Sequence, residues 1–233
     1  MASCTLWNTA IEAPSNLQTK DLKGFISLSN KALIGLFFEV VPNPGHLNHY
    51  FDYVEKLKPE LEKHNGLIWL NRYRALLDDQ CLLSHQLWDS EKWLENWQRN
   101  KLHRLAQKAG IKKHFKDYRI RIGKRLACWQ ADIVTDVNFE ITSKSDALLL
   151  SIQSGVSIPN TAFNKHASLD CVYCDLSASD QFITLVKPNN LSSALALTSS
   201  ISPDFFDKIE LFLISRNYSM KERVQAPLSK HHE

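Results

Sequence analysis

Apolar and polar positions alternate in a regular order through the first half of the chain. Residues 32–41 form a nearly continuous apolar run, rich in β-branched and aromatic side chains, which predicts a buried strand. Over residues 46–64 the apolar positions recur every three or four residues, as on one face of a helix, although Pro59 predicts a kink or an early end. Residues 67–76 and 81–88 then predict a hairpin of two strands.

A second helix and a fourth strand complete this half. Asp89 and Ser90 predict the start of a helix that ends near Gly110, and residues 118–127 alternate apolar and basic side chains like a half-buried strand. The order strand, helix, strand, strand, helix, strand is that of the ferredoxin-like fold. Such a fold leaves one face of its sheet bare, and we expect that face to pack against a second copy.

The same order returns more weakly in the second half. The pattern predicts strands at residues 147–153, 169–176, 181–187 and 208–218, a poor helix at 157–167 and a better one at 191–200. We therefore predict an α+β protein of tandem ferredoxin-like repeats, the second one degenerate. The two sheets would pack on each other as an α+β barrel, an intramolecular pseudo-dimer.

These patterns divide the chain into five segments. We expect an N-terminal extension at 1–30, the first ferredoxin-like domain at 31–128, a linker at 129–145, the second repeat at 146–227 and a tail at 228–233.

The composition is that of a globular protein, with 44% hydrophobic and 23% charged residues, and a formal charge of +3 does not require a polyanionic partner. The chain lacks an 18-residue apolar run and a secretory signal pattern, and its five scattered cysteines make a poor disulfide framework. We therefore expect a cytoplasmic protein without a membrane segment.

Motifs for several reaction classes are missing from the sequence. It has no glycine-rich phosphate loop, no Gly-x-Ser-x-Gly elbow and no His-Glu-x-x-His motif. Cys171 and Cys174 have the spacing of a metal or redox pair, but on the predicted strand they point to opposite faces. No metal site is predicted.

Tryptophan is concentrated around the second predicted helix, at Trp88, Trp93 and Trp97. Trp93 and Trp97 are four residues apart and therefore share one helix face. These rings either pack in the core or form the wall of a pocket for a flat aromatic ligand.

Polar candidates lie on the same helix and on the second strand. His103 and Gln107 are four residues apart, and a neutral His103 imidazole can take a phenolic proton, ligate haem iron, or simply hydrogen-bond near the helix end. Asn71 and Arg72 point to opposite faces of their strand, and either side chain can hold a substrate oxygen or an oxyanion.

Residues 99–125 are strongly basic, with a single acidic residue, Asp117. They form a solvated face, an anion-attracting rim suited to a carboxylated substrate such as haem, or a nucleic-acid surface. Nucleic-acid binding needs aromatic side chains on an exposed sheet, which a sheet-packed barrel would bury, so no nucleic-acid partner is predicted.

An ordered series of residues in the first half resembles the antibiotic biosynthesis monooxygenase family. They are Phe38-Glu39-Val40, Pro44-Gly45, Leu57-Lys58-Pro59-Glu60-Leu61, Gly66-Leu67-Ile68, Leu83-Ser84, Trp88-Asp89-Ser90-Glu91, Trp97, His103-Arg104, Ala106-Gln107, Gly110 and Asp117-Tyr118-Arg119-Ile120. A tail-like match at residues 216–227 follows the second repeat instead of the first, which supports a tandem origin.

The resemblance implies a ferredoxin-like domain that pairs through its sheet into an α+β barrel. Several members oxidise aromatic polyketides or quinols with molecular oxygen and without metal or flavin, and some relatives degrade haem. Because the second half lacks equivalents of Trp97 and His103, a site is expected only in the first half.

From these observations we predict a cofactor-independent monooxygenase that acts on a small aromatic or quinol. The expected catalytic residues are His103, Trp97 and Asn71, and the expected substrate-binding residues are Trp88, Trp93, Arg72, Gln107 and Tyr118. The alternatives are a non-catalytic ligand-binding or scaffold protein of the same fold, and a haem-binding or haem-degrading protein. The chain would be a monomeric pseudo-dimer or a homodimer.

Overall fold

The structure, a computed structural model, describes residues 33–130, 133–135, 147–158, 163 and 166–227. The elements of the first half are β1 (Ile34–Pro42), α1 (Leu47–Glu62), β2 (Leu67–Ala75), β3 (Leu82–Trp88), α2 (Glu91–Arg99), α3 (Lys101–Ala109), the π-helix η2 (Gly110–His114) and β4 (Phe115–Gln130). Those of the second half are β5 (Ile133–Thr135), β6 (Leu148–Ser154), β7 (Ala167–Asp175), β8 (Phe182–Pro188), α4 (Leu191–Ser200), the 3₁₀ helix η6 (Pro203–Phe205) and β9 (Lys208–Ser219).

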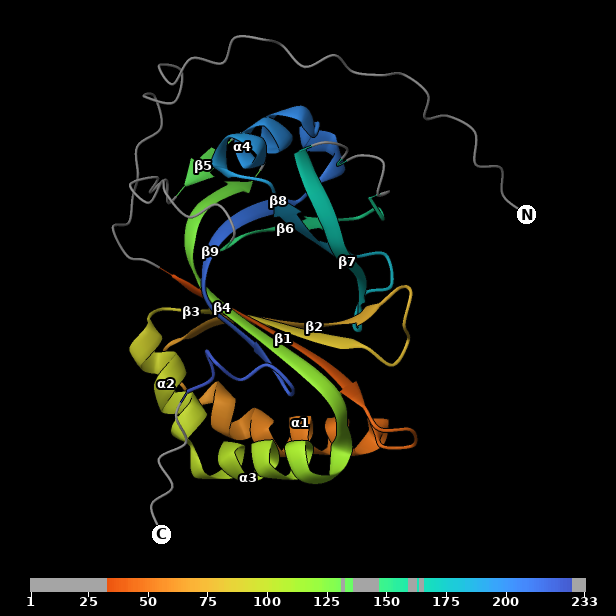
Figure 1. The fold of residues 1–233 in the computed structure, drawn as a ribbon, viewed down its shortest axis with the longest axis vertical. Coiled ribbons are helices and arrows are strands. Elements are labelled where there is room, and N and C mark those ends of the chain that lie inside the picture. The colour runs from red at the N-terminus through yellow and green to blue at the C-terminus, as the bar shows by residue number, and fades with distance from the viewer. Residues whose placement is uncertain (1–32, 131–132, 136–146, 159–162, 164–165, 228–233) are drawn as a thin grey trace, which may run out of the picture.

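The strands form one sheet that closes into a barrel (Figure 1). Its order is β1-β3-β2-β7-β8-β6-β9-β4-β5, and β1 also pairs with β4, so eight strands complete the circle. The first half contributes β4-β1-β3-β2 and the second half contributes β9-β6-β8-β7, which is the same ferredoxin-like order. The predicted α+β class with tandem ferredoxin-like repeats is confirmed.

The two repeats meet at two seams. β4 runs antiparallel to β9 over ten residue pairs, whereas β2 and β7 share only three pairs. The short seam is extended by two reciprocal bonds, in which the Leu76 amide donates to the Val172 carbonyl and the Leu176 amide donates to the Arg72 carbonyl, at 2.9 and 3.0 Å. The seams therefore close the edges of both sheets within one chain.

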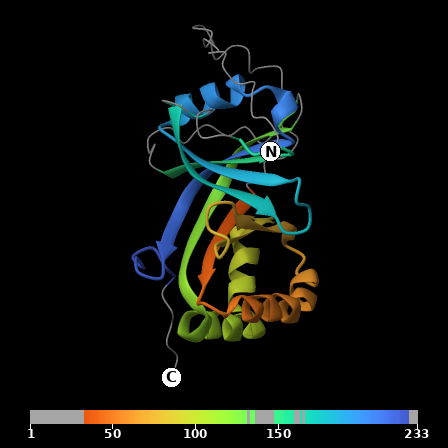
Figure 2. The same cartoon turned by 90° about the vertical axis from the view of Figure 1, so that its right-hand side faces the viewer.

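The helices cover opposite sides of this barrel, with α1, α2 and α3 outside the sheet of the first repeat and α4 outside that of the second (Figures 1 and 2). Alternation along the strands sends one set of side chains into the barrel and the other set toward the helices. Phe37, Tyr73, Tyr173 and Phe212 from both repeats fill the barrel interior, each at most 2% exposed. The bare faces of the two sheets thus bury each other.

The helix side of the second repeat is also a packed core. Phe163, Leu197, Phe206 and Ile209 contribute to a cluster in which α4 lies against the sheet. The helix side of the first repeat differs, because its core leaves a cavity.

Several local features differ from the sequence expectations. The predicted single helix after Ser90 is two helices, α2 and α3, interrupted at Asn100. Pro59 lies inside α1, and that helix ends at Glu62. β4 extends to Gln130 and β5 pairs back onto its end, so the first part of the predicted linker is strand.

Some predicted segments lie outside the described residues. These are the N-terminal extension at 1–30, most of the linker, most of the poor helix at 157–167 and the tail at 228–233. None of the helices in the described ranges is long and apolar enough to cross a membrane.

Candidate functional site

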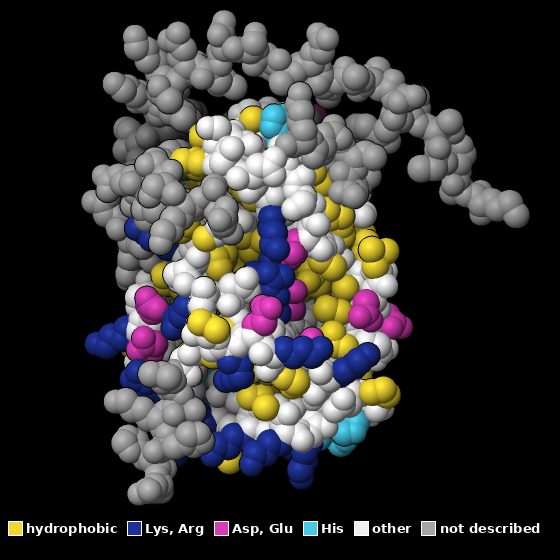
Figure 3. Space-filling view, in the orientation of Figure 1, with side chains coloured by type: hydrophobic (Ala, Val, Ile, Leu, Met, Phe, Trp, Pro, Cys, Tyr) yellow, Lys and Arg dark blue, Asp and Glu magenta, His cyan; other side chains and the backbone are white. Residues whose placement is uncertain are grey.

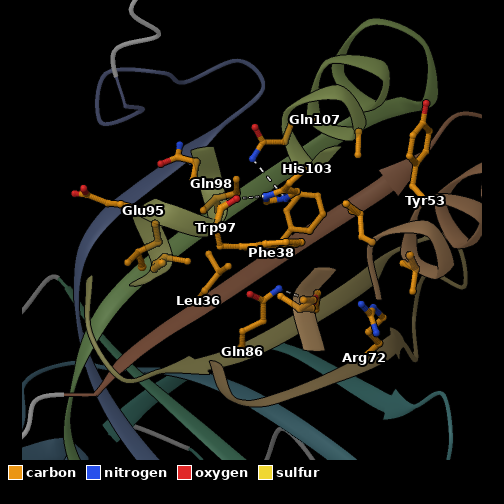
Figure 4. Close-up of a pocket in the computed structure, with 18 of the residues that line it drawn as sticks. Leu36, Phe38, Tyr53, Arg72, Gln86, Glu95, Trp97, Gln98, His103 and Gln107 are labelled. Atoms are coloured by element: carbon orange, nitrogen blue, oxygen red, sulfur yellow. Dashed lines mark hydrogen bonds between the residues drawn. The ribbon is translucent and has the colours of Figure 1, made fainter. Parts of the chain in front are cut away.

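A cavity of about 170 Å³ lies between the helices of the first repeat and the outer face of its sheet. Most of its wall is apolar, with Leu36 and Phe38 from β1, Val54 and Leu57 from α1, and Ile120 from β4. Polar side chains project into it from two sides. Figure 4 shows His103 and Gln107 on the helix side, and Gln86 and Arg72 on the sheet side.

The break between α2 and α3 places His103. Asn100 has φ −55° and ψ 132°, which ends α2, and its side-chain oxygen accepts a bond from the His103 backbone N–H at 3.1 Å. Asparagine is a preferred residue at this first position of a helix because its side chain satisfies a free N–H. The chain therefore turns at Asn100 and restarts as α3, which brings His103 back against Trp97.

His103 is held by Trp97 in two ways. The imidazole stacks on the indole, with ring centroids 4.4 Å apart and planes 16° from parallel. Its Nδ1 lies 2.9 Å from the Trp97 carbonyl oxygen, and because a carbonyl only accepts, Nδ1 must carry the proton (Figure 4). Nε2 is then the unprotonated nitrogen of the neutral ring, with the Gln107 amide nitrogen 3.5 Å away.

The surroundings of His103 favour this neutral form. Burial lowers the pKa of His103, and the hydrogen bond to Trp97 opposes only part of that shift. The imidazole is therefore uncharged at neutral pH, and the Nε2 lone pair faces the Gln107 amide across a long contact of 3.5 Å. A neutral histidine beside a cavity is suited to act as a general base.

Arg72 supplies positive charge from the sheet side. Its Nε is buried and has no hydrogen-bond partner among the described residues. The guanidinium lies beside Tyr50, whose pKa is raised by burial although Arg72 acts to lower it. An arginine with an unused donor in an apolar cavity is a natural partner for an oxyanion or carboxylate.

Gln86 and Ser84 lie on the sheet side, next to the buried ring of Trp88. The Trp88 indole N–H donates to Gln86 Oε1 at 3.0 Å, and the Gln86 amide donates to Ser84 Oγ at 3.1 Å. Trp88 is fully buried, so it supports Gln86 from behind and does not line the cavity.

Four of the predicted site residues line this cavity: His103, Trp97, Arg72 and Gln107. They come from two helices and one strand, and the Asn100 turn is what brings the helical ones together. Their catalytic and binding roles remain predictions.

Asn71 does not line the cavity. As the alternation of β2 predicted, it points away from Arg72, and its side-chain amide donates to the Asp175 carboxylate of the second repeat. Asn71 therefore lies at the β2–β7 seam, and of these two neighbours only Arg72 faces the cavity.

Trp93 and Tyr118 also lie outside the cavity lining. Trp93 packs over Gly66, where an added Cβ would come within 2.1 Å of the indole, and against the ring of His64. The Tyr118 hydroxyl accepts a hydrogen bond from Arg223, and its ring belongs to a buried cluster. Both positions are those of packing residues.

The second repeat contributes two cavity residues that sequence reasoning missed. Arg216 and Tyr218 of β9 reach the first repeat because β9 pairs with β4, where Arg216 opposes Ile122. Arg216 is held by an ion pair of 2.5 Å with Glu91. The family-like residues at 216–227 were the sequence signal for Arg216 and Tyr218. Only the pairing of β4 with β9 shows that these two residues reach the cavity.

The basic segment found in the sequence is largely a solvated face. Lys101, Arg104, Lys108 and Lys112 are exposed on α3 and η2. Lysine and arginine side chains gather along the lower edge of the surface in Figure 3, below the helices of the first repeat.

Comparison with known protein families gives a match to the part of the chain that supplies most of this cavity. Residues 34–109 match the model of the family described as antibiotic biosynthesis monooxygenase. The first half of the chain carries an antibiotic biosynthesis monooxygenase domain. That domain contains His103, Trp97 and Arg72, and β4 and β9 complete the cavity from outside it.

The similarity to one relative of this domain extends through both repeats. The chain is 25% identical over 209 residues to a protein named jasmonate monooxygenase ABM from Pyricularia oryzae, covering 84% of this chain and 97% of the relative.

Among solved structures, a candidate monooxygenase from Fusobacterium nucleatum is 11% identical, with a TM-score of 0.41, over 81% of this chain and 95% of that one. A candidate monooxygenase from Lactobacillus acidophilus is 6% identical, with a TM-score of 0.40, over 80% and 96%.

Proposed function

We propose that this protein is a cofactor-independent monooxygenase that oxidises a small hydroxyaromatic compound or quinol with molecular oxygen. The observation that carries the proposal is His103, a neutral imidazole whose tautomer is fixed by the Trp97 carbonyl beside an apolar cavity. The antibiotic biosynthesis monooxygenase domain supports the reaction class.

In this proposal His103 starts the reaction. Nε2 removes the phenolic proton, and the resulting anion is electron-rich enough to react with oxygen. Arg72 stabilises the negative charge or binds another anionic group of the substrate. Trp97 and Phe38 provide flat surfaces against which an aromatic ring packs.

Such a substrate supplies its own electrons. At an activated ring CH₂ group, two C–H bonds break and a C=O bond forms with one atom of O₂, while the second oxygen atom leaves as water with the two hydrogens. The carbon is oxidised by four electrons and O₂ is reduced by four, so no external reductant is required. A quinol gives the same balance without a CH₂ group, because one ring C–H bond is replaced by C–OH and the quinol is oxidised to the quinone, two electrons each, while the second oxygen atom again leaves as water.

The cavity volume favours a small substrate. A closed cavity of about 150 Å³ is enough for benzene, so about 170 Å³ suits a molecule of one or two rings, with substituents extending toward the open side. Haem is much larger, and the haem-binding alternative remains an untested prediction.

The name of the fungal relative suggests a second substrate class, a small apolar carboxylate such as jasmonate. Arg72 is a suitable partner for that carboxylate. Hydroxylation of a saturated carbon, however, requires two electrons beyond those of the C–H bond that is oxidised. A requirement for an added reductant therefore distinguishes jasmonate-like substrates from hydroxyaromatic ones in an experiment.

The test is oxygen consumption by the purified protein with a phenol that carries an activated CH₂ group, a naphthoquinol, and jasmonate with and without an added reductant. We expect uptake with the hydroxyaromatic compounds alone, and one labelled oxygen atom in the product from ¹⁸O₂. His103→Gln should lower turnover by about 10²–10⁴-fold, the usual contribution of a general base. His166→Gln, in the second repeat, serves as the control.

Other outcomes would replace the proposal. No oxygen uptake with any of the compounds, together with retention of a ligand by the protein, would show that the chain is a non-catalytic binding protein. A Soret band on haemin titration that is lost in His103→Ala would assign the cavity to haem. Uptake with jasmonate only when a reductant is present would contradict the cofactor-free reaction.

A further inference from the structure

Three histidines lie close together where α1 begins, and none of them lines the cavity. His46 precedes α1, His49 lies in its first turn, and His114 ends the π-helix η2. One ring nitrogen from each lies within 4.8 Å of the other two, and the Nδ1 atoms of His46 and His114 are 3.0 Å apart. Figure 3 shows histidine side chains on the surface at this end of the molecule, where α1 begins.

The backbone fixes this cluster from two directions. The Asn43 N–H donates to the His114 carbonyl at 2.8 Å, and the Asn43 side-chain amide donates to the Lys113 carbonyl at 2.9 Å. The His46 N–H in turn donates to the Asn43 carbonyl at 2.9 Å. The turn before α1 and the end of η2 are therefore held together before any ligand arrives, which lowers the entropic cost of binding one.

The arrangement of the three rings suits a cation, which binds unprotonated imidazole nitrogens. Two imidazole nitrogens at 3.0 Å need either a shared proton or a common partner, and a cation can serve all three rings at once.

An acidic group lies behind one of the rings. Asp52 is one turn along α1, and its carboxylate is 3.8 Å from His49 Nδ1. Carboxylates commonly contact the non-ligating nitrogen of a metal-bound histidine, which orients the ring and raises its basicity.

We propose that His46, His49 and His114 bind a divalent transition-metal ion, with zinc as the expected occupant. Three imidazoles suit Zn²⁺ better than Mg²⁺ or Ca²⁺, which prefer oxygen ligands, and they leave a fourth position open to water. The site is separate from the proposed oxidation chemistry. Its structural effect is to clamp the start of α1, the helix that supplies Val54 and Leu57 to the cavity, onto η2.

The test is zinc titration of the full chain, produced without a histidine tag, by calorimetry and by thermal unfolding. We expect a single equivalent to bind and to raise the melting temperature, and Co²⁺ to give the visible spectrum of a nitrogen-ligated ion. His49→Ala and His114→Ala should each weaken binding by roughly 100-fold or more, because loss of a direct ligand exceeds the roughly 10–100-fold effect of losing an outer partner.

Two controls separate this site from other histidines. His166→Gln changes a histidine of the second repeat, and a variant with His231 and His232 both changed to Gln removes the adjacent histidines near the C-terminus. Both should bind zinc like the unchanged chain. Zinc uptake that persists in His49→Ala and His114→Ala, or no uptake by the unchanged chain, would overturn the proposal. His49 is exposed, so its replacement tests the site without disturbing the core.

Discussion

At the scale of single residues, one backbone carbonyl determines what His103 can do. Because the Trp97 oxygen takes the Nδ1 proton, Nε2 is the only ring nitrogen that can accept a proton from a substrate. Burial supplies the second condition by lowering the pKa of the ring, so that the base is present at neutral pH. Neither condition is visible in the residue type alone.

The first prediction concerns the pH dependence of turnover. If neutral His103 is the base, kcat/KM falls as pH drops through its pKa, and this acidic limb should lie below the ordinary histidine value of 6.5 because burial lowers that pKa. The measurement is a kcat/KM profile from pH 4.5 to 9 for the unchanged chain and for His103→Gln, in which the limb should vanish. A limb above 6.5, or one that survives in His103→Gln, would show that another group titrates.

The second prediction concerns Arg72 and the charge of the substrate. Hydrogen bonds to charged groups contribute about 1.5–3 kcal/mol, so Arg72→Met should raise KM for an anionic substrate by about tenfold or more. The matched control is Arg74→Met, two residues along the same face of β2 but outside the cavity. Steady-state kinetics with a carboxylated and an uncharged substrate provide the readout. Equal effects of the two replacements would mean that Arg72 does not bind the substrate.

At the scale of elements, the site depends on a break that the sequence prediction missed. Trp93 and Trp97 are four residues apart, as are Leu102 and Ala106, so each pair fits a helix face, and the two pairs were joined into one predicted helix across the five-residue step from Trp97 to Leu102. Asn100 caps the start of α3 and so begins a second helix. Whether the helix breaks at this residue depends on how α2 and α3 pack against the sheet. Strand alternation was more informative, because it correctly separated Asn71 from Arg72.

The third prediction tests this break. Asn100→Ala removes the side-chain oxygen that accepts from the His103 N–H, and loss of such a cap costs about 1 kcal/mol of unfolding free energy. It should also lower turnover, since His103 and Trp97 lose their fixed relative placement. Urea unfolding and kinetics measure the two effects, with the exposed Asn48→Ala in α1 as the control. Reduced stability with full activity would show that the cap does not position His103.

At the scale of the whole molecule, the second repeat completes the first. Its strands pair with both edges of the first sheet, and β9 brings Arg216 and Tyr218 to a cavity whose other walls belong to the first repeat. The sequence predicted the repeated order of strands, because each repeat carries its own periodicity. It could not predict the contacts across the seams, which join residues about a hundred positions apart. Because both seams close within one chain, the barrel is an intramolecular pseudo-dimer.

Buried ion pairs link the repeats inside this barrel. Arg121 of β4 is 2% exposed and pairs with Glu39 of β1 and, at 2.7 Å, with Asp170 of β7. Burial acts to raise the pKa of Asp170, but Arg121, Arg119 and Lys187 outweigh it, and the pKa is lowered overall. A carboxyl with a lowered folded-state pKa adds stability above its ordinary value of 3.8 and loses it as pH falls further.

Removing the central cation should therefore be costly at neutral pH. Arg121→Met leaves Glu39 and Asp170 without their shared partner, and breaking a buried pair in this way costs about 3–5 kcal/mol. The exposed pair between Arg99 and Glu95 provides the control, because Arg99→Met should cost no more than about 1 kcal/mol.

The pH dependence of that deficit identifies its cause. Without Arg121, burial should raise the pKa of Asp170 toward or above its ordinary value, so protonation will favour the folded state of the variant. The loss of stability relative to the unchanged chain should then shrink between pH 7 and pH 4, as measured by urea unfolding at both values. A deficit that stays constant, or that matches the Arg99→Met control, would mean that packing and not charge holds the two repeats together inside the barrel.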